Sequence, residues 1–220
     1  YKIFNTAQDH KRVFEGDVGK NTGGMGAYSP SRLIDKDLEK KIINRIILPT
    51  LNHLKKNGGT YVGFLYAGLM IKNNDPYLIE YNVRMGDPEC QTILPLLEND
   101  FAGLINKCIE GDLINEEIKW KNKKSICVVL TSKGYPDDYK KNVLIKNLEK
   151  YENSENQYIF HAGTKFYEKK YFSTGGRVLN FVTLDEDLKS ARSNSIKLIE
   201  NLKWENGFYR RDIGFKVIDK

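Results

Sequence analysis

The sequence predicts an α+β fold, and three features of the 220-residue chain indicate it. Apolar residues recur at three- and four-residue intervals between residues 35 and 56, which is typical of an amphipathic helix. Two aromatic and aliphatic runs, at residues 61–71 and 77–83, enclose a cluster of turn-forming residues and predict a β-hairpin. Further strand-like runs and a long helical pattern follow, so both kinds of element contribute to the fold.

The first part of the chain should contain one long loop and one long helix. Residues 1–30 are expected to form a short strand followed by a polar loop, because five glycines precede Pro30 and leave the backbone unrestricted. The helix should begin after Asp35 as its N-cap, bend or split at Pro49, and stop at Gly58.

The remaining elements are expected in this order: short helices at residues 88–97 and 100–110, strands at 125–132, 158–165 and 176–184, and a helix at 185–203. A polar stretch at residues 119–124 indicates a boundary between two domains. We therefore expect one domain at residues 1–120 and a small mixed α+β domain at residues 121–220.

The composition indicates a globular protein and excludes other classes. Hydrophobic residues make up 40% and charged residues 29% of the chain, which excludes a disordered tail or a fibrous repeat. The longest apolar run, residues 61–71, has about half of the roughly 20 residues that a helix needs to cross a bilayer. Three widely spaced cysteines give no disulfide framework, so free thiols in a reducing compartment, and a cytoplasmic protein, are expected.

The net charge of +6 admits two explanations. The 35 lysines and arginines are dispersed among 29 acidic residues, which is typical of a solvated basic surface. The same charge would attract an anionic partner, and a phosphate-bearing small molecule fits this case as well as RNA does.

One stretch of the second hairpin strand carries the most specific chemistry. Strand side chains alternate between faces, so Glu80, Asn82 and Arg84 are expected on one face and the intervening apolar residues on the other. A carboxylate and an amide oxygen suit Mg²⁺, and an adjacent guanidinium can bind a carboxylate or phosphoryl oxygen through two hydrogen bonds. The solvent-exposed face of an ordinary edge strand explains the same spacing.

Two glycine-containing loops could contribute to a site. The Gly86–Glu89 turn has two further carboxylates and leads into an expected helix N-terminus, where unpaired N–H groups attract anions. The loop at residues 21–29 could bring backbone N–H groups close to a negative ligand, although its spacing fits neither a Walker A loop nor a dinucleotide fingerprint. A flexible linker is the alternative for this loop.

Two of the histidines and the charged run at residues 9–12 are expected to have structural or surface roles. Residues 9–12 resemble a solvated charged surface, His53 is expected on the surface of a helix, and His161 is expected to be a hydrogen-bonded histidine at a strand end. The sequence contains no serine elbow, zinc-ligand spacing or Cys–His pairing, so no apparatus for acyl-enzyme hydrolysis is evident.

Six motifs resemble those of the phosphoribosylamine–glycine ligase family in order and spacing. They are QDHKR at residues 8–12, NTGGMGAYSP at 21–30, GFLYAGLM at 63–70, EYNVRMGDPE at 80–89, HAGT at 161–164 and GGRVL at 175–179. The last two resemble the family's C-terminal domain. Several long motifs in register over the whole chain are far more specific than a single glycine pattern.

This resemblance implies an ATP-grasp enzyme of purine biosynthesis that joins glycine to 5-phospho-β-D-ribosylamine while ATP becomes ADP and phosphate. The family's metal-ligand motif falls on Glu80 and Asn82, so ATP together with Mg²⁺ or Mn²⁺ is implied, with two protein ligands for the metal. Arg84 and Asp87 are the implied catalytic residues. The implied substrate-binding residues are Asp9, Asn21, Gly23, Gly24, Pro88 and Glu89.

The resemblance begins late in the family's sequence, so an N-terminal part of the same enzyme is an implied partner. Residues 1–120 would be the last part of the ATP-grasp domain, and the 220 residues alone are not expected to catalyse. Neither nucleic acid nor membrane is an expected partner. Another ATP-grasp carboxylate–amine ligase, or a basic phosphate-binding module for RNA, remains as an alternative.

Overall fold

The computed structural model describes residues 1–218 and confirms the α+β class. The chain divides into two compact units, each built from segments that are separate in the sequence. Residues 1–4, 31–86 and 97–120 form the first, which we call the hairpin unit; residues 5–30, 87–96 and those from 121 onward form the second, which we call the sheet unit. The division of the sequence at residue 120 stays a prediction.

The predicted β-hairpin is the central element of the hairpin unit. Strand β5 (Tyr66–Lys72) pairs antiparallel with β6 (Asp75–Asn82). Strand β5 begins at Tyr66, later than the expected residue 61. The two turn residues Asn73 and Asn74 have φ of 54° and 56°, a left-handed conformation that asparagine tolerates and that a tight hairpin turn requires.

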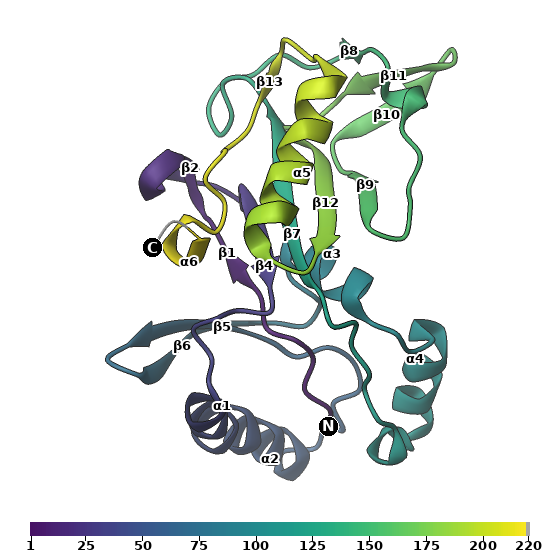
Figure 1. Ribbon diagram of the computed structural model, residues 1–220. Helices are drawn as coiled ribbons and strands as arrows, with labels where there is room; N and C mark the ends of the chain where they lie inside the picture. The colour runs from purple at the N-terminus through teal and green to yellow at the C-terminus, as the bar shows by residue number, and fades with distance from the viewer. Residues whose placement is uncertain (219–220) are drawn as a thin grey trace. The chain divides into compact units, whose positions relative to one another are not determined.

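The predicted helix is confirmed, with an interruption before Pro49. Helices α1 (Lys36–Ile42) and α2 (Leu48–Lys56) are joined by a π-helical turn at Ile43–Ile47 (Figure 1). Asp35 is the N-cap, and its Oδ1 accepts hydrogen bonds from the N–H groups of residues 37 and 38 at 3.1 and 2.8 Å. Proline has no N–H for the α-helical ladder and clashes with the carbonyl four residues earlier, so the wider turn lies where the helix must adjust.

A cluster of aromatic rings connects separate segments of the hairpin unit. The ring of Phe4 meets those of Phe64 and Trp120 edge to face, with centroids 5.8 and 5.4 Å apart. Phe64 also stacks on Phe101, the first residue of helix α4 (Phe101–Glu110), at 6.0 Å. Aromatic pairs of this geometry stabilise packing beyond the area that they bury.

The sheet unit is organised around a six-stranded antiparallel sheet. Its strands, in spatial order, are β1 (Gln8–Asp9), β4 (Gly26–Ser29), β7 (Lys124–Ser132), β12 (Arg177–Asp185) and β9 (Gln157–His161), with β13 (Gly207–Phe208) also paired to β7. Helix α5 (Leu188–Leu202) packs on β7 and β12, and Figure 1 shows it lying along the sheet. Helix α3 (Glu89–Ile93) packs on β4 and β7.

Smaller elements flank this sheet. They are the hairpin of β2 (Arg12–Phe14) and β3 (Val18–Asn21), the three-stranded sheet of β10 (Thr164–Tyr167), β11 (Lys170–Ser173) and β8 (Val143–Ile145), and the short helix α6 (Phe215–Ile218). The hydrophobic core of the sheet unit is formed by β7, β12 and α5 together with buried residues such as Met25, Tyr28 and Ile213.

The expectation of a long polar loop in residues 1–30 is wrong. The segment contains strands β1 to β4, and all residues of β4 are buried because β4 lies between β1 and β7 in the sheet. Gly26 has φ of 156°, and a Cβ there would lie 2.5 Å from the carbonyl oxygen of Cys127. The glycine therefore permits close strand packing, whereas in the sequence it suggested flexibility.

The later elements are largely confirmed. Strands β7 and β12 and helix α5 lie within one to three residues of the expected bounds. The strand expected at residues 158–165 is split into β9 and β10 at Ala162–Gly163, and the helix expected at residues 88–97 ends at Ile93 and continues as a 3₁₀ turn. Among residues 1–218, none of the helices has the length and apolarity that spanning a membrane requires.

Candidate functional site

The structure brings the predicted metal-ligand pair together on the hairpin unit. The Asn82 amide Nδ2 donates to Glu80 Oε1 at 3.2 Å. Tyr81, between them, points to the other side: its hydroxyl lies 2.8 Å from Thr50 Oγ1 and donates to the carbonyl of Ile46 at 3.1 Å. One face of β6 therefore packs on the helices, and the opposite face carries Glu80 and Asn82.

Glu80 packs closely against a glycine across the hairpin. Gly68 is the cross-strand neighbour of Glu80, and a Cβ at residue 68 would lie 3.2 Å from Glu80 Cγ. Within the described residues, no group of three or more His, Cys, Asp or Glu side chains could hold a metal. A carboxylate and an amide oxygen still fit a hard divalent cation, because Mg²⁺ takes one or two protein oxygens and completes its shell with water and substrate phosphates.

Arg84 does not lie in the strand row that the sequence predicted. Strand β6 ends at Asn82, and Arg84 lies in the following bend, where its Nη1 donates to the carbonyl of Met85 at 2.7 Å. A strand bulge between Gly68 and Leu69 on the partner strand also leaves Ile79 without a cross-strand partner. The predicted alternation is therefore right for Glu80 and Asn82 and wrong for Arg84, whose exposed guanidinium is placed by a turn.

In the sheet unit, Asp87 is held by an arginine that the sequence analysis did not single out. Arg177 Nη1 and Nη2 donate to the two carboxylate oxygens of Asp87 at 3.0 and 3.1 Å. Nη1 also donates to the carbonyls of Gly23, at 2.9 Å, and of Asp87, at 3.2 Å. One guanidinium thus fixes the glycine loop and the Asp87 turn together. Arg177 is part of the GGRVL motif that the sequence analysis noted, but nothing in the sequence indicated that Asp87 is its partner.

The glycine loop is ordered by further contacts. The N–H of Gly23 donates to the Tyr135 hydroxyl at 3.0 Å, and the N–H of Gly24 donates to Thr22 Oγ1 at 3.0 Å. These two of the loop amides that the sequence offered to an anionic ligand are therefore already hydrogen-bonded within the protein. Asn21, by contrast, is at the exposed end of β3 and is paired in register with Arg12.

Asp9 lies beneath this loop as a buried carboxylate. Its side chain is 7% exposed, and neither carboxylate oxygen has a hydrogen-bond partner among the described residues, although Lys11 Nζ lies 3.3 Å from Oδ2 as an ion pair. A Cβ at Gly24 would lie 2.9 Å from Asp9 Oδ1 and 2.5 Å from Pro88 Cδ, so these three residues pack closely. Burial, with the nearby Glu89 carboxylate, raises the pKa of Asp9 to about 7, and Lys11 opposes this shift.

The interpretation of residues 9–12 as a solvated charged surface is wrong for two of the four. Lys11 and Arg12 are exposed, but Asp9 is nearly enclosed and His10 is 3% exposed. His10 Nε2 accepts a hydrogen bond from the N–H of Gly214 at 3.0 Å, and burial lowers the pKa of His10 to about 4. The reason is that β1 and the following residues lie inside the sheet unit, against the C-terminal segment.

A buried arginine stabilises the same region. Arg210 is 0% exposed and donates to both carboxylate oxygens of Asp212 at 2.7 and 2.8 Å, to Asp17 at 2.9 Å and to the carbonyl of Arg12 at 3.0 Å. These contacts join residues near both ends of the chain. They satisfy the guanidinium and leave it no evident catalytic role.

The other candidate residues have the expected structural roles. His53 is exposed on α2, and His161 Nδ1 lies 2.8 Å from Thr164 Oγ1 at the end of β9. Cys90, Cys108 and Cys127 are free thiols. Glu89 is 3% exposed at the start of α3, and Pro88 precedes it as the N-cap residue.

Comparison with known proteins explains why these residues occur together. Residues 1–90 match the phosphoribosylglycinamide synthetase ATP-grasp (A) domain, and residues 125–216 match the phosphoribosylglycinamide synthetase C domain. The chain is 44% identical over 208 residues to the phosphoribosylamine–glycine ligase of Caldanaerobacter subterraneus subsp. tengcongensis, covering 94% of this chain and 49% of that protein. The crystal structure of the Thermotoga maritima ligase is similar, with a TM-score of 0.83 and 37% identity over 96% of this chain and 51% of that one.

The chain spans about half the length of most of these curated relatives. A relative from Vigna unguiculata, a phosphoribosylamine–glycine ligase, is 45% identical over 92% of this chain, which covers 67% of that protein. The fold matches that of a solved ligase, two consecutive domain models match the chain, and the chain covers 67% of one relative. These three findings agree on one family. The chain belongs to the phosphoribosylamine–glycine ligase family.

Proposed function

We propose that a polypeptide containing this chain joins glycine to 5-phospho-β-D-ribosylamine, with conversion of ATP to ADP and phosphate. The observation that carries this proposal is the Glu80–Asn82 pair, whose side chains meet at 3.2 Å on the face of β6 directed away from the helices. It is the donor set that a magnesium nucleotide needs, on a chain of this family. The chain supplies the last part of the ATP-grasp domain, residues 1–120, and the C-terminal domain, residues 121–220.

Glu80 and Asn82 would hold Mg²⁺ or Mn²⁺ through one carboxylate and one amide oxygen. The cation, when bound, neutralises charge on the phosphates of ATP. Arg84 contributes an exposed guanidinium that can bind a carboxylate or phosphoryl oxygen. Phosphoryl transfer depends mainly on positioning and charge neutralisation, so no protein nucleophile is required.

The reaction proceeds in two substitutions. A carboxylate oxygen of glycine attacks the γ-phosphorus of ATP, the bond to ADP breaks, and glycyl phosphate forms. The amine of phosphoribosylamine then attacks the acyl carbon, phosphate leaves, and the amine loses a proton. The product is N1-(5-phospho-β-D-ribosyl)glycinamide.

The sheet unit would hold the substrates. Asp9 has two buried oxygens whose one described ion pair is with Lys11, at 3.3 Å, and they could also accept from the N–H groups of an amine. Asp87 orients the attacking amine, and Arg177 fixes its carboxylate through two hydrogen bonds. The remaining substrate-binding residues in this proposal are Asn21, Gly23, Gly24, Pro88 and Glu89.

Exposed apolar side chains of the hairpin unit support a further partner, the part of the relatives that this chain does not contain. Five side chains near Glu80 are 40–76% exposed: Met70, Tyr77, Leu78, Ile79 and Val83. We infer that these side chains meet that missing part, because exposed apolar side chains gathered in one patch are typical of an interface. The proposed cytoplasmic location rests on the free thiols, and one plant relative is named as chloroplastic.

The test uses this chain within a polypeptide of the length of its curated relatives. Glu80→Ala should lower the rate of glycinamide ribonucleotide formation by roughly a hundredfold or more, because it removes the charged ligand of the cation. Glu98→Ala, an exposed carboxylate of the same unit, is the matched control and should retain the rate. Near-normal activity of Glu80→Ala at limiting Mg²⁺ would refute the proposal, as would the absence of glycine-dependent ADP release from the unaltered protein.

A further inference from the structure

Gln91 makes a direct contact with the Asp87 carboxylate. It lies in α3, four positions after Asp87, so about one helical turn separates the two residues. The Gln91 amide Nε2 donates to Asp87 Oδ1 at 3.1 Å. Helix α3 buries Thr92 and Ile93 and packs on β4 and β7, so the amide projects from an element that is fixed in the sheet unit.

The orientation of the Gln91 amide leaves its oxygen without a partner. Oε1 is inaccessible to solvent and accepts no hydrogen bond from the described residues. If the amide were turned over, Oε1 would face Asp87 Oδ1, and two acceptors repel each other, so the carboxylate dictates the direction of the amide. A buried acceptor without a donor destabilises the fold, and a cost of this kind is expected where a group is held for function.

The same carboxylate is already neutralised by Arg177. The Arg177 Nη1 and Nη2 donate to Asp87 Oδ1 and Oδ2 at 3.0 and 3.1 Å. This bidentate pair balances the charge of Asp87, so the contact with Gln91 is not required for that purpose. The Gln91 contact adds a second element, α3, to the strand β12 that carries Arg177. The carboxylate therefore cannot rotate without losing a hydrogen bond to one of these elements.

The three donors occupy the two oxygens of Asp87 unequally. A carboxylate oxygen has two lone pairs. Oδ1 accepts from both Arg177 and Gln91, whereas Oδ2 accepts from Arg177 alone among the described residues. The Asp87 side chain is 45% exposed, so a ligand can reach it. Oδ2 is therefore the oxygen with capacity for a further donor.

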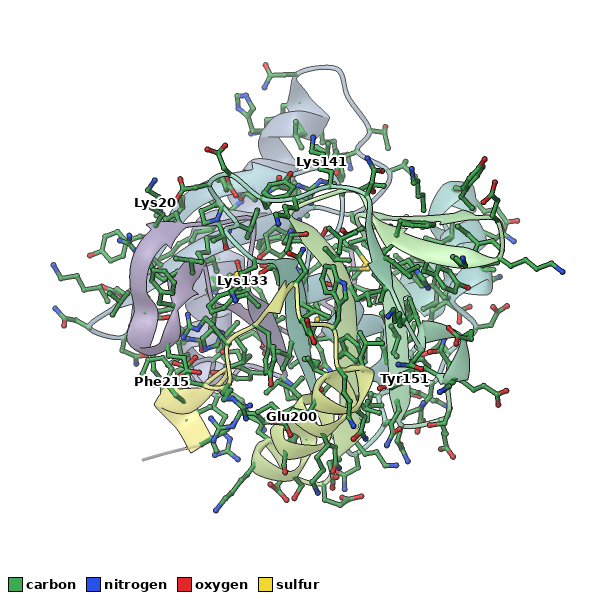
Figure 2. All side chains as sticks on the ribbon, turned by 90° about the horizontal axis from the view of Figure 1, so that it is seen from above. Lys20, Lys133, Lys141, Tyr151, Glu200 and Phe215 are labelled. Carbon is green, nitrogen blue, oxygen red and sulfur yellow. The ribbon has the colours of Figure 1, made fainter. Side chains whose placement is uncertain are left out.

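The Arg177 guanidinium is itself held by the glycine loop. Its Nη1 donates to the carbonyl of Gly23 at 2.9 Å, and the N–H of Gly23 donates to the Tyr135 hydroxyl at 3.0 Å. Lys20, labelled in Figure 2, lies in β3 just before this loop and pairs with Asp137, with Nζ 2.6 Å from Oδ1. The two hydrogen bonds from Arg177 to the carboxylate thus come from a side chain that is fixed in place.

We propose that Gln91 is a positioning residue for the ligase reaction, which fixes Asp87 so that Oδ2 is the oxygen that accepts from the attacking amine. This assignment rests on the proposed function, in which Asp87 orients the amine of phosphoribosylamine. Gln91 acts on turnover through the direction of the carboxylate and without contact to the substrate. With both lone pairs of Oδ1 occupied, a single orientation of the amine is favoured.

The test measures steady-state formation of glycinamide ribonucleotide in a polypeptide of the relatives' length. Gln91→Met keeps the length of the side chain and removes both the donor and the unpartnered acceptor. It should lower kcat by roughly tenfold, because the carboxylate regains rotation, and leave the KM for ATP unchanged. The urea midpoint of unfolding should not fall, since losing the hydrogen bond is offset by losing the buried acceptor. Gln157→Met, at an exposed position of β9, is the control and should retain the kcat.

A second variant reverses the contact. Gln91→Glu keeps the size of the side chain and places a carboxylate oxygen where the donor was. It should lower kcat further than Gln91→Met does, because two carboxylates in contact repel each other. An unchanged kcat in either Gln91 variant would overturn the proposal.

A double-mutant cycle separates this positioning role from a general structural one. In an Asp87→Asn background, Gln91→Met should change kcat by less than about twofold, because the group through which Gln91 acts is already altered. An equal fall of kcat in both backgrounds would overturn the proposal. Absence of glycine-dependent ADP release from the unaltered protein would refute the proposed function and this assignment with it, whereas full turnover of the Gln91 variants in an active ligase would overturn the assignment alone.

Discussion

Asp9 is the residue at which stability and the proposed function oppose each other. A carboxylate whose pKa is raised to about 7 in the fold is favoured there in its protonated form. Its contribution to stability is therefore fully present below about pH 4 and is lost as the pH rises through 7. At pH 8 the fold holds a buried, ionised carboxylate that is paired with the Lys11 ammonium at 3.3 Å. Such a cost is expected where the group serves a ligand.

Asp9→Asn should therefore stabilise the chain and impair the reaction. At pH 8 the free energy of unfolding should rise by up to about 4 kcal/mol, the equivalent of a pKa shift of about three units. Activity in the longer polypeptide should fall, because an amide cannot replace a carboxylate facing an amine. Urea unfolding and the activity assay measure the two effects, with Glu205→Gln as an exposed control. Loss of stability at pH 8 would show that Asp9 is a structural residue.

His10 has the opposite dependence on pH. Its pKa is about 4 in the fold, below the ordinary value of 6.5, because burial and the nearby Arg210 charge disfavour the protonated ring. The unfolded chain takes up the proton first, so stability should fall by about 3 kcal/mol between pH 6.5 and 4. The fall should be measured by urea unfolding in the Asp9→Asn background, where the opposing titration is absent. A flat profile there would contradict the burial of a neutral His10.

At the scale of the elements, Arg177 is the connection that organises the candidate substrate site. It stands at the start of β12 and donates to Gly23 of the glycine loop and to Asp87 before α3. Two loops that are far apart in the sequence are thus positioned by one strand. Under the proposed function, this contact would affect turnover through the geometry of Asp87.

Arg177→Lys should lower kcat by roughly ten- to a hundredfold in the longer polypeptide, because an ammonium cannot reproduce two parallel hydrogen bonds. The KM for ATP should be unchanged. Arg45→Lys, at an exposed arginine that pairs with Asp75 at 3.0 Å, is the control and should have no effect. Unchanged kcat in Arg177→Lys would show that the contact with Asp87 does not contribute to the reaction.

The elements differ in how far their sequence predicts them. The Glu80–Asn82 pair depends on strand alternation alone, which is a local property, and the structure confirms it. Strand β4 was missed because its glycine reads as a loop signal and its partners, β1 and β7, lie elsewhere in the chain. The contact between Asp87 and Arg177 joins residues 90 positions apart, and no periodicity encodes such a pair.

At the scale of the whole molecule, the two family domains do not coincide with the two compact units. Strands β1 and β4 and the start of α3 lie in the matched ATP-grasp region, yet they pack with β7 and β12 of the matched C domain in the sheet unit. The polar stretch at residues 119–124 suggested a domain boundary because a locally polar composition predicts exposure to solvent. Pairing between β4 and β7 depends on the packed sheet, which composition does not report.

The central claim is that Glu80 and Asn82 hold the divalent cation of a ligase. The most direct measurement is a Mg²⁺ titration of glycinamide ribonucleotide formation in the longer polypeptide, comparing Asn82→Asp with Asn82→Leu. The aspartate variant keeps an oxygen ligand and should retain activity with a similar or lower Mg²⁺ requirement, whereas the leucine variant should require roughly tenfold more Mg²⁺ or lose activity. Superimposable titrations of the unaltered protein and Asn82→Leu would contradict the account.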